Sequence, residues 1–510
     1  MKLEDKLIKL PNSWAIVKLG DFVNSEKGKK PQSESKTQTT THSLPYIDIQ
    51  AFEEGVIKSW TDGIGCRLCS ETDFLMVWDG SRSGLVGKGV NGALGSTLVR
   101  INFPSMVNDY AFYFLQSKYQ QINTRAKGSG TPHVDPDLLW NYKFPIPPKN
   151  EQHRIVAKIE ALFSELDKGI ESFKTAREQL KTYRQALLKH AFSGKLTEQW
   201  RAEMRDRDNI PSRDVIPNLP NAEALLQRIQ TEREYRYQQQ LKDWEATGKQ
   251  GSKPKAPKTL PPLTAEELAE LPELPEGWAW VRVGEISDVQ LGRQRSPNNR
   301  SNKFPTKYIR AGNITENGLK LDEVLDMEFD PQEKGRFLLA YGDVLLSEAS
   351  GSANQVGKPA IWRDEIEECC FQNTVIRVRS LTLNEYLFWV FKTYYVTGVF
   401  SKLSGGVGIN HLSAGKLESM EIPIVGKLES EKILELINEK LSLIENVDQT
   451  LTTALQQAEA LRQSILKKAF SGQLVPQDPN DEPASVLLER IQAEKTKLDL
   501  AAPRRRGAKA

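Results

Sequence analysis

The chain has 510 residues, of which 39% are apolar and 27% charged, and its formal net charge is +2. This balance excludes a uniformly basic, histone-like protein, although local basic clusters can still bind nucleic acid. Four cysteines make no disulfide framework, no apolar run reaches about 18 residues, and no signal peptide precedes the first domain, so we expect a soluble, cytoplasmic protein of about three domains.

Residues 1–148 predict a first globular domain of mixed α and β structure. Short β-prone runs, bounded by Gly, Asn, Asp and Ser, lie at residues 14–19, 46–50, 74–78 and 97–101. An aromatic-rich amphipathic helix is expected over residues 109–120. We assign its aromatic side chains to the core of the domain.

A long helix is predicted over residues 151–192, directly after this domain. The stretch has a single glycine, Gly169, and no proline, and its apolar residues recur in steps of three and four. That spacing is typical of a coiled-coil seam. Such a helix is about 60 Å long and needs a partner to bury its apolar stripe.

The middle of the chain predicts short helices and a tether. Residues 239–276 are rich in Pro, Lys and Glu, with four lysines between positions 249 and 258. This composition is typical of an extended linker, and a short helix is expected near residues 263–271.

The second half of the chain repeats the first. Nine of 17 positions are identical between residues 180–196 and 458–474, and Trp14–Gly20 matches Trp278–Gly284. The offset changes from 264 to 278 along the repeat, so the second copy carries about 14 extra residues. A period of this size indicates duplicated domains.

The second copy therefore predicts the same elements. Its β-prone runs lie at residues 278–283, 307–311, 343–347 and 374–379, followed by helices at 384–396 and 428–470. We expect domain boundaries of 1–148, 149–195, 196–272, 273–425, 426–472 and 473–510, the last being a helix with a basic tail.

The fold class that follows is α+β, with two pseudo-symmetric α/β domains joined by two long helices. The simplest partner for each long helix is the other copy, and an antiparallel pair gives a coiled coil with a pseudo-twofold axis. The alternative is that each helix packs on its own domain.

Several catalytic signatures are missing from the sequence. It has neither the GxxxxGK[ST] phosphate loop nor the [DNS]PP[YF] motif of amino-methyltransferases. Gly87–Gly92 matches GxGxxG, but no βαβ pattern surrounds it. Cys66–Cys69 is a CxxC without the two further ligands that zinc requires. We expect no catalytic residue and no metal site, and interpret the chain as a binding and organising protein.

Basic loops are the candidate nucleic-acid contacts. Residues 289–310 contain six basic residues and no acid, and residues 80–106 contain three basic residues and no acid. A basic loop follows the first strand in both copies, which favours phosphate and base contacts over an ordinary solvated loop. The candidates are Lys27, Lys29, Lys30, Arg82, Lys88, Ser129, Arg293, Arg295, Arg300, Lys307, Arg310, Asn354 and Lys358.

Two glycine-rich turns recur as well. Residues 127–131 precede His133, and residues 404–408 precede His411, each before a short expected helix. Backbone N–H groups of such a turn can hold a phosphate, although a plain connecting loop explains the turns equally well.

The duplicated pattern resembles the specificity (S) subunit of type I restriction-modification systems, the HsdS family, over essentially the whole chain. The motifs are Phe144–Pro148 with Glu151-Gln152 and Ala191–Leu196, repeated as Gly277-Trp278, Ile422–Ile424 and Ala469–Leu474. The second copy departs from the pattern at Val425-Gly426, which replaces the proline pair, and at Ser430, which replaces the glutamine.

The resemblance implies a non-catalytic subunit whose two target recognition domains each read half of a bipartite DNA site. The long helices would set the gap between half-sites, and the chain would dock two methyltransferase (M) subunits, with Phe192 and Phe470 as candidate contacts, and through them restriction (R) subunits. S-adenosylmethionine, ATP and Mg²⁺ would then belong to these partners, and this chain would hold no cofactor. Because the two domains differ inside, we expect two different half-sites and an asymmetric target.

Two other functions remain open from the sequence. A coiled-coil adaptor that binds only proteins would show no affinity for DNA with all its partners present. A self-sufficient nuclease or methyltransferase would be active as a purified chain, which the missing motifs disfavour. A DNA reader is set apart by an affinity that falls steeply with salt.

Overall fold

The computed structural model describes residues 10–104, 106–128, 130–208, 221–249, 253–294, 303–350, 355–403 and 410–501. The chain divides into two compact units. The N-terminal unit combines residues 1–175 with 451–510, and the C-terminal unit comprises residues 176–450. Among the described residues, no helix is long and apolar enough to cross a membrane.

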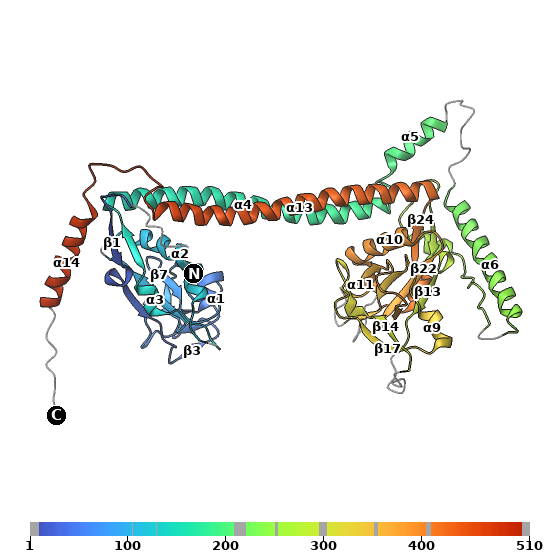
Figure 1. The fold of residues 1–510 in the computed structure, drawn as a ribbon, viewed down its shortest axis with the longest axis horizontal. Coiled ribbons are helices and arrows are strands. Elements are labelled where there is room, and N and C mark those ends of the chain that lie inside the picture. The colour runs from blue at the N-terminus through green and yellow to red at the C-terminus, as the bar shows by residue number, and fades with distance from the viewer. Residues whose placement is uncertain are drawn as a thin grey trace. The chain divides into compact units, whose positions relative to one another are not determined.

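The N-terminal unit is built on a four-stranded antiparallel sheet. Its strand order is β2 (Asn24–Lys27), β10 (Leu98–Asn102), β7 (Phe74–Val77) and β8 (Val86–Lys88). One face packs on α2 (Asn108–Thr124), which lies between this sheet and the start of α4 (Lys149–Ala191) (Figure 1). The aromatic residues of α2 are buried in this core, as the sequence predicted.

A second, smaller sheet covers the other face of the first. Its order is β3 (Glu34–Ser35), β5 (Trp60–Thr61), β4 (Leu44–Ile47), β9 (Gly92–Leu94) and β6 (Leu68–Cys69). Ile47, Leu75 and Leu94 pack between the two sheets. The strand expected over residues 46–50 ends at Ile47, because Asp48 caps α1 (Ile49–Glu54) by accepting a 2.8 Å hydrogen bond from the Ala51 N–H.

The C-terminal unit repeats this plan. Its main sheet has the order β13 (Ser287–Leu291), β22 (Val375–Ser380), β18 (Val344–Ser347) and β20 (Pro359–Ile361). Helix α10 (Asn384–Val396) covers one face. The other packs on α9 (Pro331–Phe337) and on a sheet of β17 (Leu325–Glu328), β14 (Pro305–Ile309) and β21 (Cys370–Phe371).

The strand registers show which residues of the two units correspond. Leu75 opposite Arg100 corresponds to Leu345 opposite Arg377. In the same way, the parallel pair of Tyr46 and Ala93 corresponds to Tyr308 and Cys370. The extra residues of the second copy are therefore spread over several loops between matching strands.

A two-stranded ribbon leads into each long helix. In the N-terminal unit β1 (Ala15–Lys18) pairs with β11 (Lys143–Ile146), and in the C-terminal unit β12 (Ala279–Arg282) pairs with β24 (Glu421–Ile424). Equivalent hydrogen bonds fasten the domain helices to these ribbons: the Tyr110 hydroxyl donates to the Pro145 carbonyl at 2.9 Å and the Tyr386 hydroxyl to the Pro423 carbonyl at 3.0 Å.

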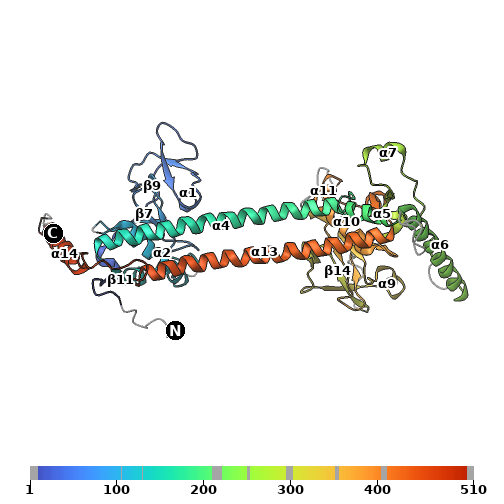
Figure 2. The same cartoon turned by 90° about the horizontal axis from the view of Figure 1, so that it is seen from above.

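The two long helices, α4 and α13 (Lys427–Ala469), are antiparallel and pack side by side (Figure 2). In the C-terminal unit Arg177 pairs with Asp448 at 3.0 Å and Arg184 with Glu445 at 3.5 Å, so positions rise in one helix as they fall in the other. In the N-terminal unit Arg462 pairs with Asp167. The predicted antiparallel pairing is confirmed.

Each long helix also packs on a globular domain, so the two arrangements that the sequence left open occur together. Ile155, Ile159 and Phe163 at the start of α4 lie in the core of the N-terminal unit. Ile433 and Ile437 at the start of α13 lie in the core of the C-terminal unit.

The ends of the long helices are exchanged between the copies. Phe192, just after α4, is 6% exposed and packs edge-on against Tyr386 of the C-terminal unit, with ring centroids 5.3 Å apart. Phe470, just after α13, packs in the same way against Tyr110 and Phe114 of the N-terminal unit. Each domain is therefore completed by the helix end of the other copy.

The remaining helices are α5 (Glu198–Asp208), α6 (Ala222–Ala246), α7 (Ala265–Glu270) and α14 (Ala484–Ala501). The prediction that the tether begins at residue 239 is wrong, because α6 continues to Ala246 and ends before Gly248, which has φ +72°. The change of sequence at Ser430 is accommodated. Its hydroxyl donates to the Lys427 carbonyl at 2.7 Å, and α13 begins at the position equivalent to the start of α4.

Candidate nucleic-acid interface

Three basic side chains of the N-terminal unit lie near the end of the main sheet where β7 stops. Lys27 pairs with Asp79 at 2.7 Å, Lys127 with Asp135 at 2.9 Å, and Arg82 with Glu53 of α1. Because each cation already faces a carboxylate, these pairs add little net positive charge for a phosphate.

Lys29 and Lys30 differ from these three cations. Both are exposed, and no ion pair joins either of them to a carboxylate among the described residues. They follow Gly28, where the chain crosses the start of β10 so closely that a Cβ would lie 2.1 Å from the Gly95 carbonyl oxygen. Lys88 is exposed too, but it lies opposite Phe74, at the other end of β7.

The equivalent crossing in the C-terminal unit confirms that the basic loops correspond. A Cβ at Gly292 would lie 2.2 Å from the Gln372 carbonyl oxygen. Arg293 follows it, but its side chain is 12% exposed, stacks on Phe329 at 5.3 Å and pairs with Glu333 at 3.3 Å. The structure thus places Arg293 among packing residues, so its DNA contact stays a prediction.

The other candidates of the C-terminal unit occupy varied positions. Lys307 forms an exposed ion pair with Asp326 at 3.6 Å. The Nε atom of Arg310 is buried and has no hydrogen-bond partner among the described residues. Lys358 contacts the Gln355 side chain, and its N–H donates to the Ser347 hydroxyl at 3.0 Å. Candidates outside the described residues are Ser129, Arg295, Arg300 and Asn354.

The two histidines after the glycine-rich turns lie at matching places. The backbone of His133 forms an antiparallel β-bridge with Asp79, shortly after β7. The backbone of His411 pairs in the same way with Ala349, shortly after β18. His411 also contacts the Glu348 carboxylate. Burial raises the pKa of Glu348, and the neighbouring imidazole counters part of that effect. The repeat predicted this correspondence, which is confirmed.

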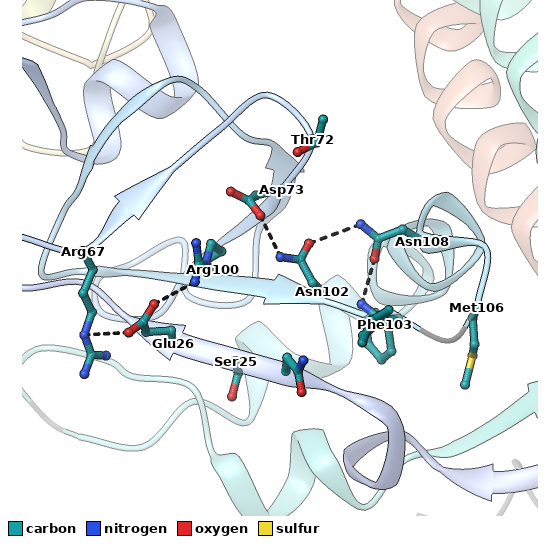
Figure 3. A pocket seen from close by; sticks show the side chains of 12 residues that line it. Ser25, Glu26, Arg67, Thr72, Asp73, Arg100, Asn102, Phe103, Met106 and Asn108 are labelled. Carbon is teal, nitrogen blue, oxygen red and sulfur yellow. Dashed lines mark hydrogen bonds and ion pairs between the residues drawn. The ribbon is translucent and has the colours of Figure 1, made fainter. Parts of the chain in front are cut away.

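A polar pocket of about 790 Å³ opens at the β2 edge of the N-terminal sheet (Figure 3). Glu26 bridges Arg67 and Arg100 at 3.0 and 2.8 Å. Asn102 donates to Asp73 at 2.7 Å and accepts from Asn108 at 3.2 Å. The residues that line this pocket come from segments far apart in the sequence, so no local sequence motif indicated the pocket.

Hydrogen bonding sets the charge state of Asp73 in this pocket. Burial alone would raise the pKa of Asp73, but hydrogen bonds from Asn102 and from Ser70 outweigh it and lower the pKa below its usual value. The carboxylate is therefore ionised at neutral pH and holds the loop before β7 in place.

The C-terminal unit carries different chemistry at the same framework positions. Arg379 takes the place of Asn102 and donates two 2.6 Å hydrogen bonds to Asp343. Arg377 takes the place of Arg100 and donates to Asp288 and Gln290 at 3.0 and 3.1 Å. One scaffold thus holds two different sets of polar side chains.

Within the described residues, no group of three or more His, Cys, Asp or Glu side chains is arranged to hold a metal ion. The Cys69 thiol donates to the Val90 carbonyl at 3.1 Å, and burial raises its pKa to about 11. A neutral buried thiol is a packing group rather than a nucleophile or a ligand.

Comparison with known proteins decides the family. The family model described as "Type I restriction modification DNA specificity domain" matches residues 11–172 and 275–457, which is more than half of the chain. The chain belongs to this family. Both matched regions contain one globular domain and the beginning of a long helix.

The chain is similar to specificity subunits along its whole length. It is 23% identical to the type I restriction enzyme MjaVIII specificity subunit of Methanocaldococcus jannaschii, covering 92% of this chain and 94% of that protein. It is 21% identical to the EcoDI specificity subunit of Escherichia coli, covering 96% of each. A solved structure described as "Structural basis underlying complex assembly and conformational transition of the type I R-M system" contains a chain with the same fold, at 18% identity and a TM-score of 0.60, covering 91% of this chain and all of that one.

In this specificity subunit the candidate partner contacts Phe192 and Phe470 pack inside their own chain, and their role in docking stays a prediction. Exposed apolar side chains lie elsewhere on the long helices of the C-terminal unit: Tyr183 is 52% exposed, Leu443 57% and Val447 48%. Val447 belongs to the apolar periodicity of residues 428–470, but its side chain is not buried against α4.

Proposed function

We propose that each globular domain reads one half of a bipartite, asymmetric DNA site. The observation that carries the proposal is that one scaffold holds two different sets of polar side chains. The strand register is the same in both units, yet Asn102 and Glu26 in one are replaced by Arg379 and Gln290 in the other. Different donors and acceptors on a common frame are suited to recognising two different base sequences.

Positioning of the two readers falls to the long helices in this proposal. Helix α4 begins in the N-terminal unit and ends in the C-terminal unit, and α13 runs the opposite way. Each 43-residue helix has a length of about 64 Å at 1.5 Å per residue. Recognition elements that read one face of a duplex lie about 34–36 Å apart per helical turn, so a rigid helix pair is a suitable spacer.

Methylation and cleavage belong to partner subunits in this proposal. S-adenosylmethionine, ATP and Mg²⁺ bind to those methyltransferase and restriction subunits, while this chain supplies the DNA sequence specificity. The exposed Tyr183, Leu443 and Val447 support docking of methyltransferase subunits on the helices, since large apolar side chains gain most when a partner covers them.

The test is to sequence the methylated positions in the genome of cells that express this chain with its methyltransferase partner. A split motif with a fixed unspecified gap is expected, and exchange of residues 1–148 for those of a relative should change one half only. If the subunits co-purify but no new methylation appears, the chain is an adaptor and the DNA-reading proposal fails.

A further inference from the structure

A polar loop connects β3 and β4 in the second sheet of the N-terminal unit. These two strands do not pair with each other, because β5 lies between them. Its residues 36–43 read Lys-Thr-Gln-Thr-Thr-Thr-His-Ser, with no apolar and no acidic side chain. All are exposed except His42, which is half-buried. A segment of this composition contributes nothing to a hydrophobic core, so burial does not explain its side chains.

The loop is held in shape by its own hydrogen bonds. The Thr39 N–H donates to the His42 carbonyl at 3.1 Å, and the His42 N–H donates to the Thr39 hydroxyl at 3.0 Å. The Gln38 amide donates to the Ser43 carbonyl at 3.3 Å. Because the turn is already closed, little conformational entropy is lost when its tip binds a ligand.

The tip residue Thr40 is exposed and is left out of this network. No hydrogen bond from its side chain is found in the part of the chain that the structure describes. A threonine hydroxyl can donate and accept, and its methyl group can contact a thymine methyl, so one side chain offers both kinds of base contact.

Unpaired cations precede the tip of the loop. Lys29, Lys30 and Lys36 are exposed, and no described carboxylate forms an ion pair with them. Between Gly28 and Ile47 the only acidic residue is Glu34. This segment thus keeps its positive charge, in contrast to Lys27, whose charge Asp79 offsets.

The other copy provides an independent observation. After the equivalent close crossing at Gly292, residues 293–303 contain no acid and four basic residues, of which Arg293 is paired with Glu333. The two domains differ in most side chains, yet both carry an acid-free basic segment directly after the same glycine. Shared charge at one point of two divergent domains indicates a shared polyanionic ligand.

We propose that the loop of residues 36–43 enters a groove of DNA, with Thr40 at a base edge and Lys29, Lys30 and Lys36 on phosphates. The inference rests on the proposed function, because it assigns reading residues to the N-terminal domain. The major groove is about 12 Å wide and exposes base edges that such a loop can contact. Lysines that precede the tip position it on the DNA backbone without reading sequence.

The phosphate contacts are tested by salt dependence. The complex with methyltransferase subunits is titrated with a duplex that carries the methylated motif, using the wild type and the double variant Lys29→Ala/Lys30→Ala. Each lost phosphate contact lowers the slope of log affinity against log salt by about 0.9, so the slope should fall by about 1.8. The matched control is Lys18→Ala/Lys143→Ala, which removes two exposed lysines of the same unit, on β1 and β11.

The base contact is tested by the methylation motif of Thr40→Ala. We expect discrimination to weaken by about fivefold or more at one position of one half-site, with the other half-site and the gap unchanged. Hydrogen exchange of β4 and β5 should match the wild type, because Thr40 supports no described contact.

The outcomes separate the two proposals. Absence of a split motif with the wild-type chain overturns the proposed function itself. A split motif that Thr40→Ala leaves unchanged, together with equal salt slopes for the two lysine double variants, overturns the loop assignment alone.

Discussion

Phe192 belongs to the first copy in sequence but to the C-terminal unit in structure. Its ring is 6% exposed and packs on Tyr386, which is fully buried at the start of α10. Truncating a buried phenylalanine to alanine costs about 3–5 kcal/mol, of which edge-on ring contact supplies about 1 kcal/mol. We therefore expect Phe192→Ala to destabilise the C-terminal unit by about 3 kcal/mol or more.

Hydrogen exchange with mass spectrometry measures this effect region by region. A loss of 3 kcal/mol raises the opening constant about 150-fold, so amides of β22 and α10 should exchange correspondingly faster. Amides of β10 and α2, in the N-terminal unit, should be unaffected. The reciprocal variant Phe470→Ala should show the opposite pattern, with a smaller effect of about 2 kcal/mol, since its ring is only partly buried.

The reciprocal design makes the reasoning refutable. If Phe192→Ala speeds exchange in the N-terminal unit, or in neither unit, the helix ends do not complete the opposite domains. If the free chain is unchanged but binding of methyltransferase subunits is lost, Phe192 is a docking residue, as the resemblance first implied.

Three further predictions concern two glycines, the length of the helix pair and one ion pair. Gly28→Ala should destabilise the N-terminal unit by about 1–3 kcal/mol, because the added Cβ would collide with the backbone around Gly95. Gly169→Ala should instead stabilise α4 by up to about 1 kcal/mol, because no atom lies within 4 Å of the added Cβ. Thermal unfolding of both variants checks that the two changes in stability have opposite signs. Adding four residues within 165–185, with a matching insertion in the facing part of α13, lengthens the helix pair by about 6 Å. The gap in the methylated motif should then widen by about two base pairs, while both half-sites are kept. An unchanged gap would show that the helices are not the spacer. Arg154 lowers the pKa of Asp481, so their ion pair is present at neutral pH and is lost as pH falls through that lowered pKa. Acidification, or Asp481→Asn at pH 7, should therefore speed amide hydrogen exchange around residue 481. Equal exchange in the wild type and the variant at pH 7 would contradict this role.

Periodic features could be predicted from the sequence because their cause is local. Steps of three and four along residues 151–192 give one apolar stripe, and α4 follows it to within two residues at each end. The strand at 74–78 and the helix at 384–396 were predicted for similar reasons. The internal repeat added the pairing of equivalent elements, including His133 with His411.

The candidate site could be predicted only in part. Sequence reasoning found the basic loops after Gly28 and Gly292, but not which cations remain unpaired. Lys27 is offset by Asp79, 52 residues away, while Lys29 is not. Acid-free stretches are visible in the sequence, whereas a carboxylate brought in from another strand is not.

By itself the sequence determined the duplication, the long helices and their need for a partner, since each depends on residues close together in the chain or on direct self-similarity. Only the tertiary structure decided which domain each helix end completes. Phe192 and Phe470 stand in identical Ala-Phe-Ser-Gly motifs, and either could have folded back on its own copy. The antiparallel register of α4 and α13 places the C-terminal end of each helix at the domain of the other copy. Such a register is a property of the packed helix pair and cannot be read from the sequence of either helix alone.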